Sequence, residues 1–271
     1  MHKMSDVELK LKLKSMLHDF KEICNTNSIP YFLCWGTLLG AARHNGFIPW
    51  DDDMDVCIFR QDYERLRSII NSNEKYKFVD HTNNNEYYWN FARFTDVNTT
   101  YIESHNVPYV SGLGVFIDIF VIENAPPKDE REVWASTYKN LLTTIYAIVP
   151  SKTIYDPGIK NLKRHLYDIY RHQKMKGYNF NEIRNDLINW VKKYENTNGD
   201  DVMIPDVTFT LQSQIFPKEL FSEVTTLEFE GELYSVPCGY DRVLQITYGD
   251  YMQLPPVDKR VSHHNFTAYQ K

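Results

Sequence analysis

An acidic run that opens an apolar segment constrains the fold of this chain more than any other feature. Residues 51–59 read DDDMDVCIF, and the alternation that begins at Asp53 is typical of a β-strand. In a strand, residues two positions apart lie on the same face, with their Cα atoms about 7 Å apart. The sequence therefore predicts that the carboxylates of Asp53 and Asp55 converge on one point.

Two carboxylates that share a half-buried site repel each other unless a cation lies between them. Oxygen ligands suit Mg²⁺ or Mn²⁺, which accept carboxylates, keep waters and bind phosphate groups. No His or Cys has the spacing of a zinc site. A solvated acidic turn is the simpler alternative, but the apolar residues on both sides of the run favour a buried site. We therefore expect a divalent metal at Asp53 and Asp55.

A calcium-binding loop is another alternative for these carboxylates. The positions 1, 3, 5 and 12 of an EF-hand loop are matched by Asp51, Asp53, Asp55 and Asp62. The pattern fails at position 6, where Val56 stands in place of Gly, and no helix is predicted to lead into the loop. The sequence therefore favours the magnesium type of site over calcium.

The segment before the acidic run has the composition of a phosphate-binding turn. Residues 31–35 predict a short strand that ends at Gly36-Thr37. Gly36 lets the backbone come close to a ligand, and the Thr37 amide and hydroxyl can hold phosphate oxygens where a helix begins. Arg43, later in the same helix, is the predicted phosphate-binding cation, because a guanidinium group matches phosphate geometry. A surface salt bridge is the alternative role for Arg43.

Two further charged residues lie in strand-like segments. Arg93 stands among aromatic residues in a strand predicted over residues 87–95, and it is a second candidate for binding phosphate. Asp118 is the one carboxylate within GVFIDIFVI, residues 114–122, which predicts a buried strand. An unpaired charge there would cost several kcal/mol. Either a neighbouring Arg or a metal shared with Asp53 and Asp55 can compensate it.

The segment GTLLGAARHNGFIPWDDDMDV, residues 36–56, resembles the LicD family of phosphocholine transferases, to which the fukutin-type proteins are related. Gly36-Thr37 followed by Asp53-Met54-Asp55 is similar to the Gly-Ser/Thr and Asp-x-Asp pattern of the nucleotidyltransferase superfamily. The segments IDIF around Asp118 and YGDYMQLPP near the C-terminus resemble further family segments. The resemblance extends over most of the chain and is loosest in its helical middle.

The resemblance implies an α+β fold with a nucleotidyltransferase-type mixed sheet flanked by helices and followed by a helical region. It makes Asp118 the third carboxylate beside Asp53 and Asp55, together holding two Mg²⁺ (or Mn²⁺) ions. The implied donor is CDP-choline or a related CDP-alcohol, with CMP released. The implied acceptor is a hydroxyl of a cell-surface glycan, teichoic-acid or lipopolysaccharide precursor, including a lipid-linked one. Because cation–π contacts hold quaternary ammonium groups, Trp35 and Trp50 near the motifs are candidate aromatic walls.

Other classes of function remain open at this point. Nucleotidyl transfer from an NTP would use the same metals, and a metal-dependent glycosyltransferase would also bind a nucleotide diphosphate through Asp-x-Asp. A calcium-binding or pseudoenzyme interaction module is the non-enzymatic alternative. The product that appears with CDP-choline, an NTP or a UDP-sugar distinguishes these classes.

Size and composition predict an ordinary globular protein. The 271 residues are 42% hydrophobic and 24% charged, and we expect one compact unit in which a catalytic core, 1–125, carries a helical and C-terminal region, 126–271. A net charge of −6 argues against nucleic acid as partner. No long apolar run predicts a transmembrane segment or signal peptide, so we expect the chain in the cytoplasm, including the inner membrane surface. Its four cysteines predict reduced core thiols.

Several local patterns predict further elements. Ser5 and Glu8 have capping-box spacing, which predicts a helix toward Asn27. Its predicted apolar stripe consists of Val7, Leu11, Leu17, Phe20, Ile23 and Cys24. Residues 129–195 read as mainly helical, and the basic residues between 160 and 176 read as a solvated helix face. A hairpin is expected over residues 227–236 and a short helix over residues 240–248. His263-His264 reads equally well as a surface pair or a functional one.

Overall fold

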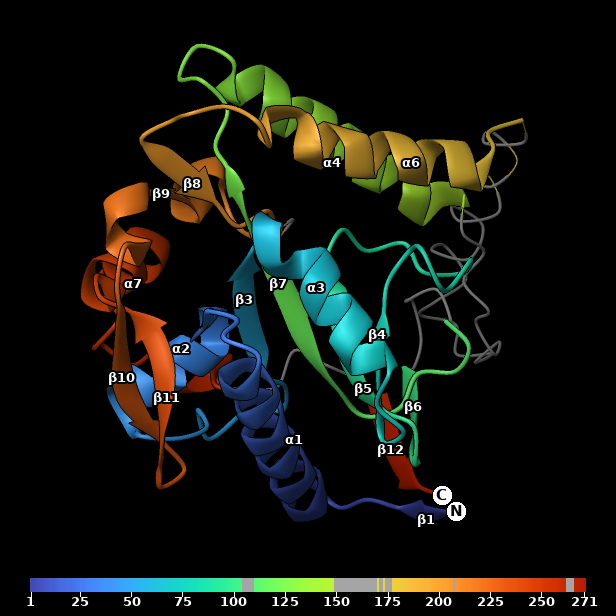
Figure 1. Cartoon of the computed structure of the whole chain (residues 1–271), viewed down its shortest axis with the longest axis vertical. Coiled ribbons are helices and arrows are strands. Elements are labelled where there is room, and N and C mark those ends of the chain that lie inside the picture. Colours follow the sequence, from blue (N-terminus) through green and yellow to red (C-terminus); the bar gives the residue numbers. More distant parts are fainter. Residues whose placement is uncertain (104–109, 149–169, 171–172, 174–176, 207, 262–265) are drawn as a thin grey trace.

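The computed structural model describes the chain except for residues 104–109, 149–169, 171–172, 174–176, 207 and 262–265. At its centre lies a seven-stranded mixed sheet (Figure 1). Five strands run in the order β2 (Tyr31–Leu33), β3 (Asp55–Phe59), β7 (Phe116–Asn124), β5 (Ala92–Asp96) and β4 (Tyr76–Val79). β8 (Asp201–Met203) pairs with the end of β7, and β9 (Ile215–Pro217) pairs with β8.

Strands β3 and β7 are parallel, whereas the other pairs of this sheet are antiparallel. Between them the chain forms α3 (Arg60–Asn71), β4, β5 and β6 (Thr99–Glu103). The mixed sheet with its surrounding helices confirms the predicted α+β class. The strand expected over residues 87–95 is shorter than predicted, because β5 begins only at Ala92.

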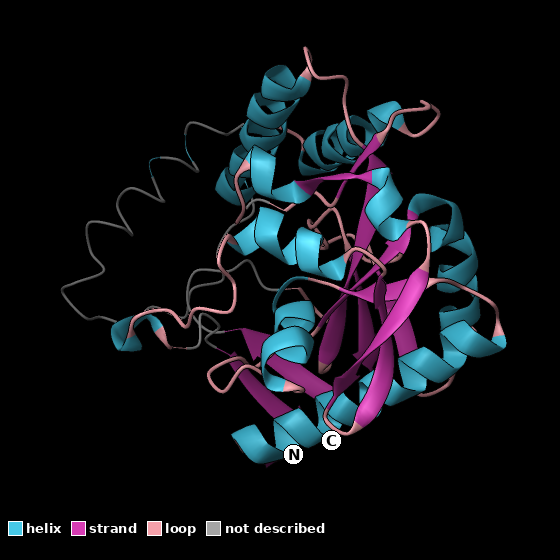
Figure 2. Cartoon of the chain, turned by 90° about the vertical axis from the view of Figure 1, so that its left-hand side faces the viewer, coloured by secondary structure: helices cyan, strands magenta, loops and turns pink. Residues whose placement is uncertain are grey.

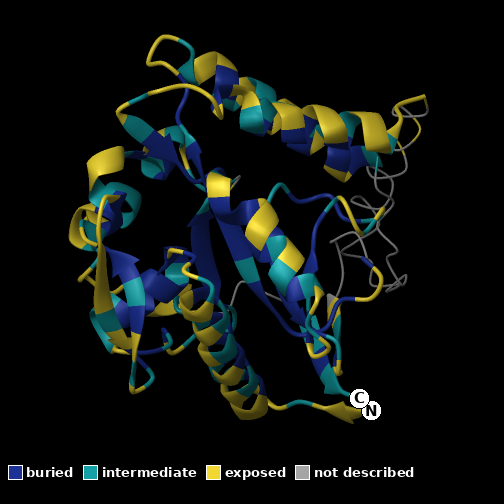
Figure 3. Ribbon diagram, viewed as in Figure 1, coloured by how far each residue is buried: buried dark blue, intermediate teal, exposed yellow. Residues whose placement is uncertain are grey.

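Helices α1 (Asp6–Thr26) and α3 cover one face of the sheet (Figure 1). The Ser5–Glu8 capping box is confirmed, with the Ser5 hydroxyl accepting from the Glu8 amide. The predicted stripe was wrong at Val7 and Leu11, whose exposed fractions are 69% and 62%. The stripe is confirmed at Leu17, Phe20 and Cys24, which are buried. The buried face of α1 (Figure 3) also includes Leu9, Leu13 and Met16.

Helices α4 (Arg131–Ile148) and α6 (Phe180–Val191) lie side by side across one end of the sheet (Figures 1 and 2). The indole nitrogen of Trp134 donates to the Trp190 carbonyl at 3.3 Å, and the Trp190 indole donates back to the Trp134 carbonyl at 3.1 Å. These helices confirm the predicted helical character of the described part of residues 129–195. Most of the basic stretch between 160 and 176 lies outside the described residues.

The C-terminal part of the chain returns to the sheet and to the N-terminus. β12 (Phe266–Gln270) lies between β1 (His2–Lys3) and β6, which brings the two termini together (Figure 1). The predicted hairpin is present as β10 (Val224–Phe229) and β11 (Glu232–Pro237), with Glu230 and Gly231 both at positive φ in its turn. The predicted short helix is α7 (Tyr240–Tyr248).

The remaining elements are α2 (Trp35–His44) and the 3₁₀ turns η2 (Lys192–Tyr194), η3 (Leu211–Gln214), η4 (Lys218–Phe221) and η5 (Val257–Lys259). In the part of the chain that the structure describes, no helix has the length and apolar character that a membrane crossing requires. Three of the cysteines are buried free thiols, but Cys238 is exposed, so the expectation of a core position was wrong for that residue.

Candidate active site

A row of charged side chains crosses three neighbouring strands. Asp118 on β7 lies opposite Asp55 on the parallel strand β3 and opposite Arg93 on the antiparallel strand β5. Residues in register on neighbouring strands point to the same face of a sheet. Phe94, the residue after Arg93, packs edge-on against Phe20 of α1 with 5.4 Å between ring centroids. The charged row therefore lies on the face that points away from α1.

Asp118 and Arg93 form an ion pair, with 3.0 Å between Arg93 Nε and Asp118 Oδ1. The Arg93 side chain is only 5% exposed, and its guanidinium lies over the rings of Trp89 and Phe116, 4.0 and 3.7 Å from their centroids. Asp118 also lies close enough to Asp55 to raise the pKa of that carboxyl. The structure therefore supplies the first of the two expected partners, an Arg, and places Asp118 beside Asp55 as well.

The acidic residues before β3 form a loop instead of the first part of the strand. Asp51, Asp52 and Asp53 each place a carboxylate oxygen within 4.8 Å of the other two, and β3 begins only at Asp55. The prediction that Asp53 and Asp55 share one face of a strand was therefore wrong in its geometry. Burial raises the pKa of Asp55 well above its usual value, and the charges of Asp53, Asp118 and Asp51 raise it further.

The Gly36-Thr37 pair belongs to the first turn of α2, which packs against the acidic residues. The strand predicted through Trp35 ends at Leu33, and Trp35 is already helical. Thr37 Oγ1 accepts a hydrogen bond from the Asp55 amide at 2.8 Å. A Cβ atom at Gly36 would lie 2.8 Å from Asp51 Oδ2 and 3.9 Å from Asp55 Oδ2. Gly36 therefore allows α2 and the acidic loop to approach each other closely.

Arg43 lies near the end of α2 and contacts the C-terminal part of the chain. Its Nη1 donates to the Tyr251 carbonyl at 2.6 Å, and its Nε donates to the His44 ring at 3.0 Å. Burial and the nearby Arg260 both lower the pKa of Arg43. Arg260 in turn lies over Trp50, 5.7 Å from the ring centroid. Within the described residues neither guanidinium forms an ion pair with a carboxylate.

Trp35 is buried, with an exposed fraction of 6%, and its backbone has a positive φ of 44°. Its ring stacks on Phe209 with 4.3 Å between centroids and meets Phe120 edge-on at 6.0 Å. Phe120 lies two residues after Asp118 on β7, so both point to the same face. Trp35 is therefore a backing residue of the site, whereas Trp50 is half-buried at its edge.

Sequence analysis missed Asp206, which lies in the loop after β8. Its charge raises the pKa of Asp55, and burial raises the pKa of Asp206 itself. The Asp-x-Thr spacing of residues 206–208 is typical of a side-chain turn, but nothing local relates this turn to the acidic run. Tyr248 of the predicted YGDY motif belongs to the same surroundings: burial raises the pKa of its hydroxyl, and the charges of Asp55, Asp51 and Asp206 raise it further.

The donor atoms at this site fit a magnesium-type metal. They are carboxylate oxygens, mutually repelling and partly withdrawn from water, and the glycine at position 36 leaves them room. The calcium-loop alternative does not fit, because the fourth carboxylate it needs, Asp62, is buried on α3 beyond the opposite end of β3. Asp62 instead lies near Cys24 of α1: burial raises the pKa of this thiol, and the charge of Asp62 raises it further. His263-His264 lies outside the described residues.

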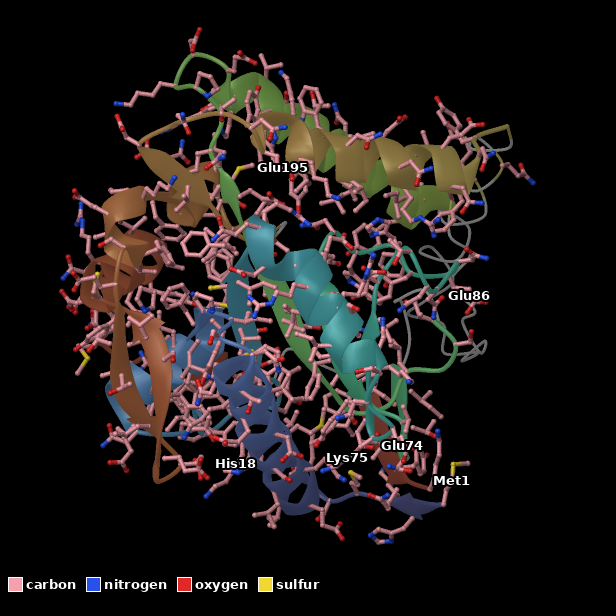
Figure 4. The ribbon with its side chains drawn as sticks, in the orientation of Figure 1. Met1, His18, Glu74, Lys75, Glu86 and Glu195 are labelled. Carbon is pink, nitrogen blue, oxygen red and sulfur yellow. The ribbon has the colours of Figure 1, made fainter. Side chains whose placement is uncertain are left out.

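A cavity of about 940 Å³ lies at the other end of β3 and β7. Its lining includes Arg60, Glu123 and Glu195, the last of which Figure 4 labels near the end of β7 that faces α4 and α6. Arg60 and Glu123 form a buried ion pair with each other. This cavity is lined by the carboxyl ends of the two strands and does not include the charged row.

The chain is similar to proteins of one family. Residues 28–155 match the family model described as LicD/FKTN/FKRP, nucleotidyltransferase domain. The chain is 28% identical over 275 aligned positions to the lipopolysaccharide cholinephosphotransferase LicD of Haemophilus influenzae, covering 99% of each protein.

Two shorter matches cover part of the chain. An uncharacterised protein of Rickettsia prowazekii is 43% identical over 60 residues, which are 22% of this chain and 23% of that protein. One of Rickettsia typhi is 42% identical over 60 residues, 22% of this chain and 19% of that protein. The family model covers the charged row, the acidic loop and the Gly36-Thr37 turn, and the Haemophilus protein aligns from end to end. Together these matches support membership of the LicD family.

Proposed function

We propose that this protein, a phosphotransferase of the LicD family, moves phosphocholine from CDP-choline to a hydroxyl group of a lipopolysaccharide or related cell-surface glycan precursor, with release of CMP. The observation that carries the proposal is the row of Asp55, Asp118 and Arg93 beside the acidic loop, in a chain similar throughout to a cholinephosphotransferase. A nucleotidyltransferase-type arrangement of the sheet is part of the same proposal.

Asp53, Asp55 and Asp118 would hold Mg²⁺ or Mn²⁺, with Asp51 close by. Such a metal, when bound, neutralises charge on the diphosphate and on the leaving CMP. Arg93 Nε donates to Asp118 Oδ1 and so orients this carboxylate. Thr37 accepts from the Asp55 amide and fixes the start of β3 relative to α2. The protein's own contribution is therefore a rigid set of oxygen ligands.

The diphosphate needs cationic partners from the protein itself. Arg43 and Arg260 are the proposed pair, because each is half-buried and neither has a carboxylate partner within the described residues. The Gly36-Thr37 turn contributes backbone donors at the first turn of α2. Asp53, on the loop, is the proposed acceptor for the proton of the acceptor hydroxyl, since Asp118 Oδ1 is already bonded to Arg93.

Parallel incubations test the proposal against the other transferase classes. The purified protein with Mg²⁺ receives CDP-choline, each NTP, or a UDP-sugar, together with lipopolysaccharide precursors that offer a free hydroxyl. We expect CMP and phosphocholine-modified glycan from CDP-choline alone. Pyrophosphate from an NTP would identify a nucleotidyltransferase, UDP would identify a glycosyltransferase, and no product in any arm would favour a non-enzymatic module.

A further inference from the structure

One buried side chain hydrogen-bonds to the backbone of Asp206. Gln214, 4% exposed, accepts from the Asp206 amide through Oε1 at 2.8 Å and donates through Nε2 to the Thr210 carbonyl at 3.3 Å. Its own carbonyl accepts from the Ile204 amide at 3.0 Å. Gln214 thus forms hydrogen bonds with residues before and after Asp206 as well as with Asp206 itself, and these bonds restrict the position of Asp206.

The Asp206 carboxylate is only half satisfied by the protein. Its Oδ1 accepts from the Thr208 amide and from the Thr208 hydroxyl, both at 2.8 Å. Within the described residues its Oδ2 forms no hydrogen bond and no Lys, Arg or His forms an ion pair with Asp206. A carboxylate in such a position is costly unless a cation compensates it. Costly charges of this kind gather at sites that bind ligands.

Aromatic rings pack together beside the segment that carries this carboxylate. Phe209 follows Thr208 directly, and its ring is backed by Trp35 with 4.3 Å between centroids. The Tyr248 ring meets Phe209 edge-on at 5.9 Å. Phe209 and Tyr248 are both partly exposed, whereas Trp35 is buried behind them. The two outer rings therefore offer apolar surface to a ligand beside Asp206.

This surface adjoins the charged row without belonging to it. Trp35 directly precedes Gly36, and its ring meets Phe120, two residues along β7 from Asp118. Asp206 lies three residues before Phe209, whose ring stacks on that same Trp35. The segment with Asp206 therefore adjoins the charged row through Trp35, on the side where a group joined to a cluster-bound phosphate would extend.

We propose that Asp206, Phe209 and Tyr248 form the subsite that receives the quaternary ammonium group of the donor. This inference rests on the proposed function and names the part of the protein that selects the choline end of CDP-choline. A quaternary ammonium has no N–H group to donate, so it is held by charge and by ring surfaces. One free carboxylate oxygen with two rings offers that combination, whereas a primary ammonium needs several hydrogen-bond acceptors.

Two substitutions test the subsite, and each leaves the metal-binding carboxylates in place. Asp206→Asn retains an oxygen that can accept from Thr208, so it removes the charge while keeping the turn. Phe209→Leu removes a ring face. Asp186→Asn, at an exposed position on α6, is the matched control for loss of one negative charge. Calorimetry with Mg²⁺ measures the affinity of each variant for CDP-choline, CDP-ethanolamine and CDP.

We expect Asp206→Asn and Phe209→Leu each to weaken CDP-choline binding by about three- to thirty-fold. Binding of CDP should be unchanged, and so should the stabilisation of the protein by Mg²⁺. Phe209→Leu should also reduce the preference for CDP-choline over CDP-ethanolamine. An equal loss for CDP and CDP-choline in Asp206→Asn would overturn the subsite and assign Asp206 to the metal or phosphate site.

The failure of this inference can be separated from failure of the proposed function. A wild-type preference for CDP-choline over CDP that both variants retain would overturn the subsite alone. If wild-type protein bound CDP-choline no better than CDP, and bound an NTP or UDP-sugar more tightly, both the subsite and the proposed function with CDP-choline as donor would be wrong.

Discussion

Asp55 and Asp118 stand directly opposite each other on the neighbouring parallel strands β3 and β7. Like charges in this arrangement repel, and the burial of Asp55 increases the cost. On its other side Asp118 has Arg93 as an ion-pair partner, 3.0 Å away. The two aspartates therefore differ. The charge of Asp55 is destabilising in the absence of metal, whereas the charge of Asp118 is compensated by Arg93.

For Asp55→Asn we expect loss of turnover without loss of stability. The substitution removes one charge from a repelling group, so the metal-free protein should be as stable as wild type or more stable. Asp53→Asn should behave in the same way. Thermal unfolding in EDTA and turnover of CDP-choline measure the two effects. Activity above about a tenth of wild type in either variant would contradict the metal assignment.

The pH dependence of stability should identify the same carboxyl group. The pKa of Asp55 is raised by burial and by Asp53, Asp118, Asp51 and Asp206, so the folded protein binds its proton more tightly than the unfolded chain does. The contribution of Asp55 to stability is therefore present at low pH and is lost as pH rises from about 4 through the raised pKa. Unfolding of the EDTA-treated protein across this range should show a decline that Asp55→Asn reduces and Mg²⁺ reverses.

Asp118→Asn should have the opposite effect on stability. It leaves the Arg93 guanidinium buried without its carboxylate partner, which we expect to cost about 3 kcal/mol of the free energy of unfolding, with or without metal. Urea denaturation in EDTA, compared with Asp55→Asn, measures the difference. If both variants were equally stable, the ion pair would have no structural role and Asp118 would act through the metal alone.

Gly36→Ala should act on the acidic loop. The added Cβ would lie 2.8 Å from Asp51 Oδ2, so the loop has to move. We expect the affinity for Mg²⁺ to fall by about tenfold or more, because small displacements of the groups around a metal weaken its binding. Gly199→Ala, where the nearest atom is 3.8 Å away, is the control. Unchanged Mg²⁺ affinity in Gly36→Ala would show that Asp51 is remote from the metal.

Arg43→Ala should weaken CDP and CDP-choline alike, by about 1.5–3 kcal/mol for a lost charge-assisted phosphate contact. Arg260→Ala should have the same pattern, and Arg43→Lys should recover part of the loss because the charge remains. Calorimetry with both ligands provides the comparison. Because Arg43 also donates to the Tyr251 carbonyl, a variant that loses stability but binds CDP normally would limit Arg43 to anchoring the C-terminal segment.

The sequence alone determined the elements whose signals are local. The capping box at Ser5, the hairpin turn at Glu230-Gly231 and the helix that ends at Tyr248 were predicted correctly because each depends on neighbouring residues. Periodic patterns predicted strands and helices, and the family resemblance implied their α+β arrangement. The buried face at the start of α1 was predicted wrongly, since Val7 and Leu11 are as apolar as Leu9 and Leu13 and only packing against the sheet selects which pair is buried.

The tertiary structure alone decided which charged groups meet. Sequence analysis required a partner for Asp118 but could not choose it, because Arg93 reaches it only through the register between β5 and β7. Asp206 and Tyr248 carry no signal that relates them to Asp55. They follow Asp55 in the chain by 151 and 193 residues. Long-range pairing of strands and packing of loops fix these contacts, and residue patterns record only short-range preferences.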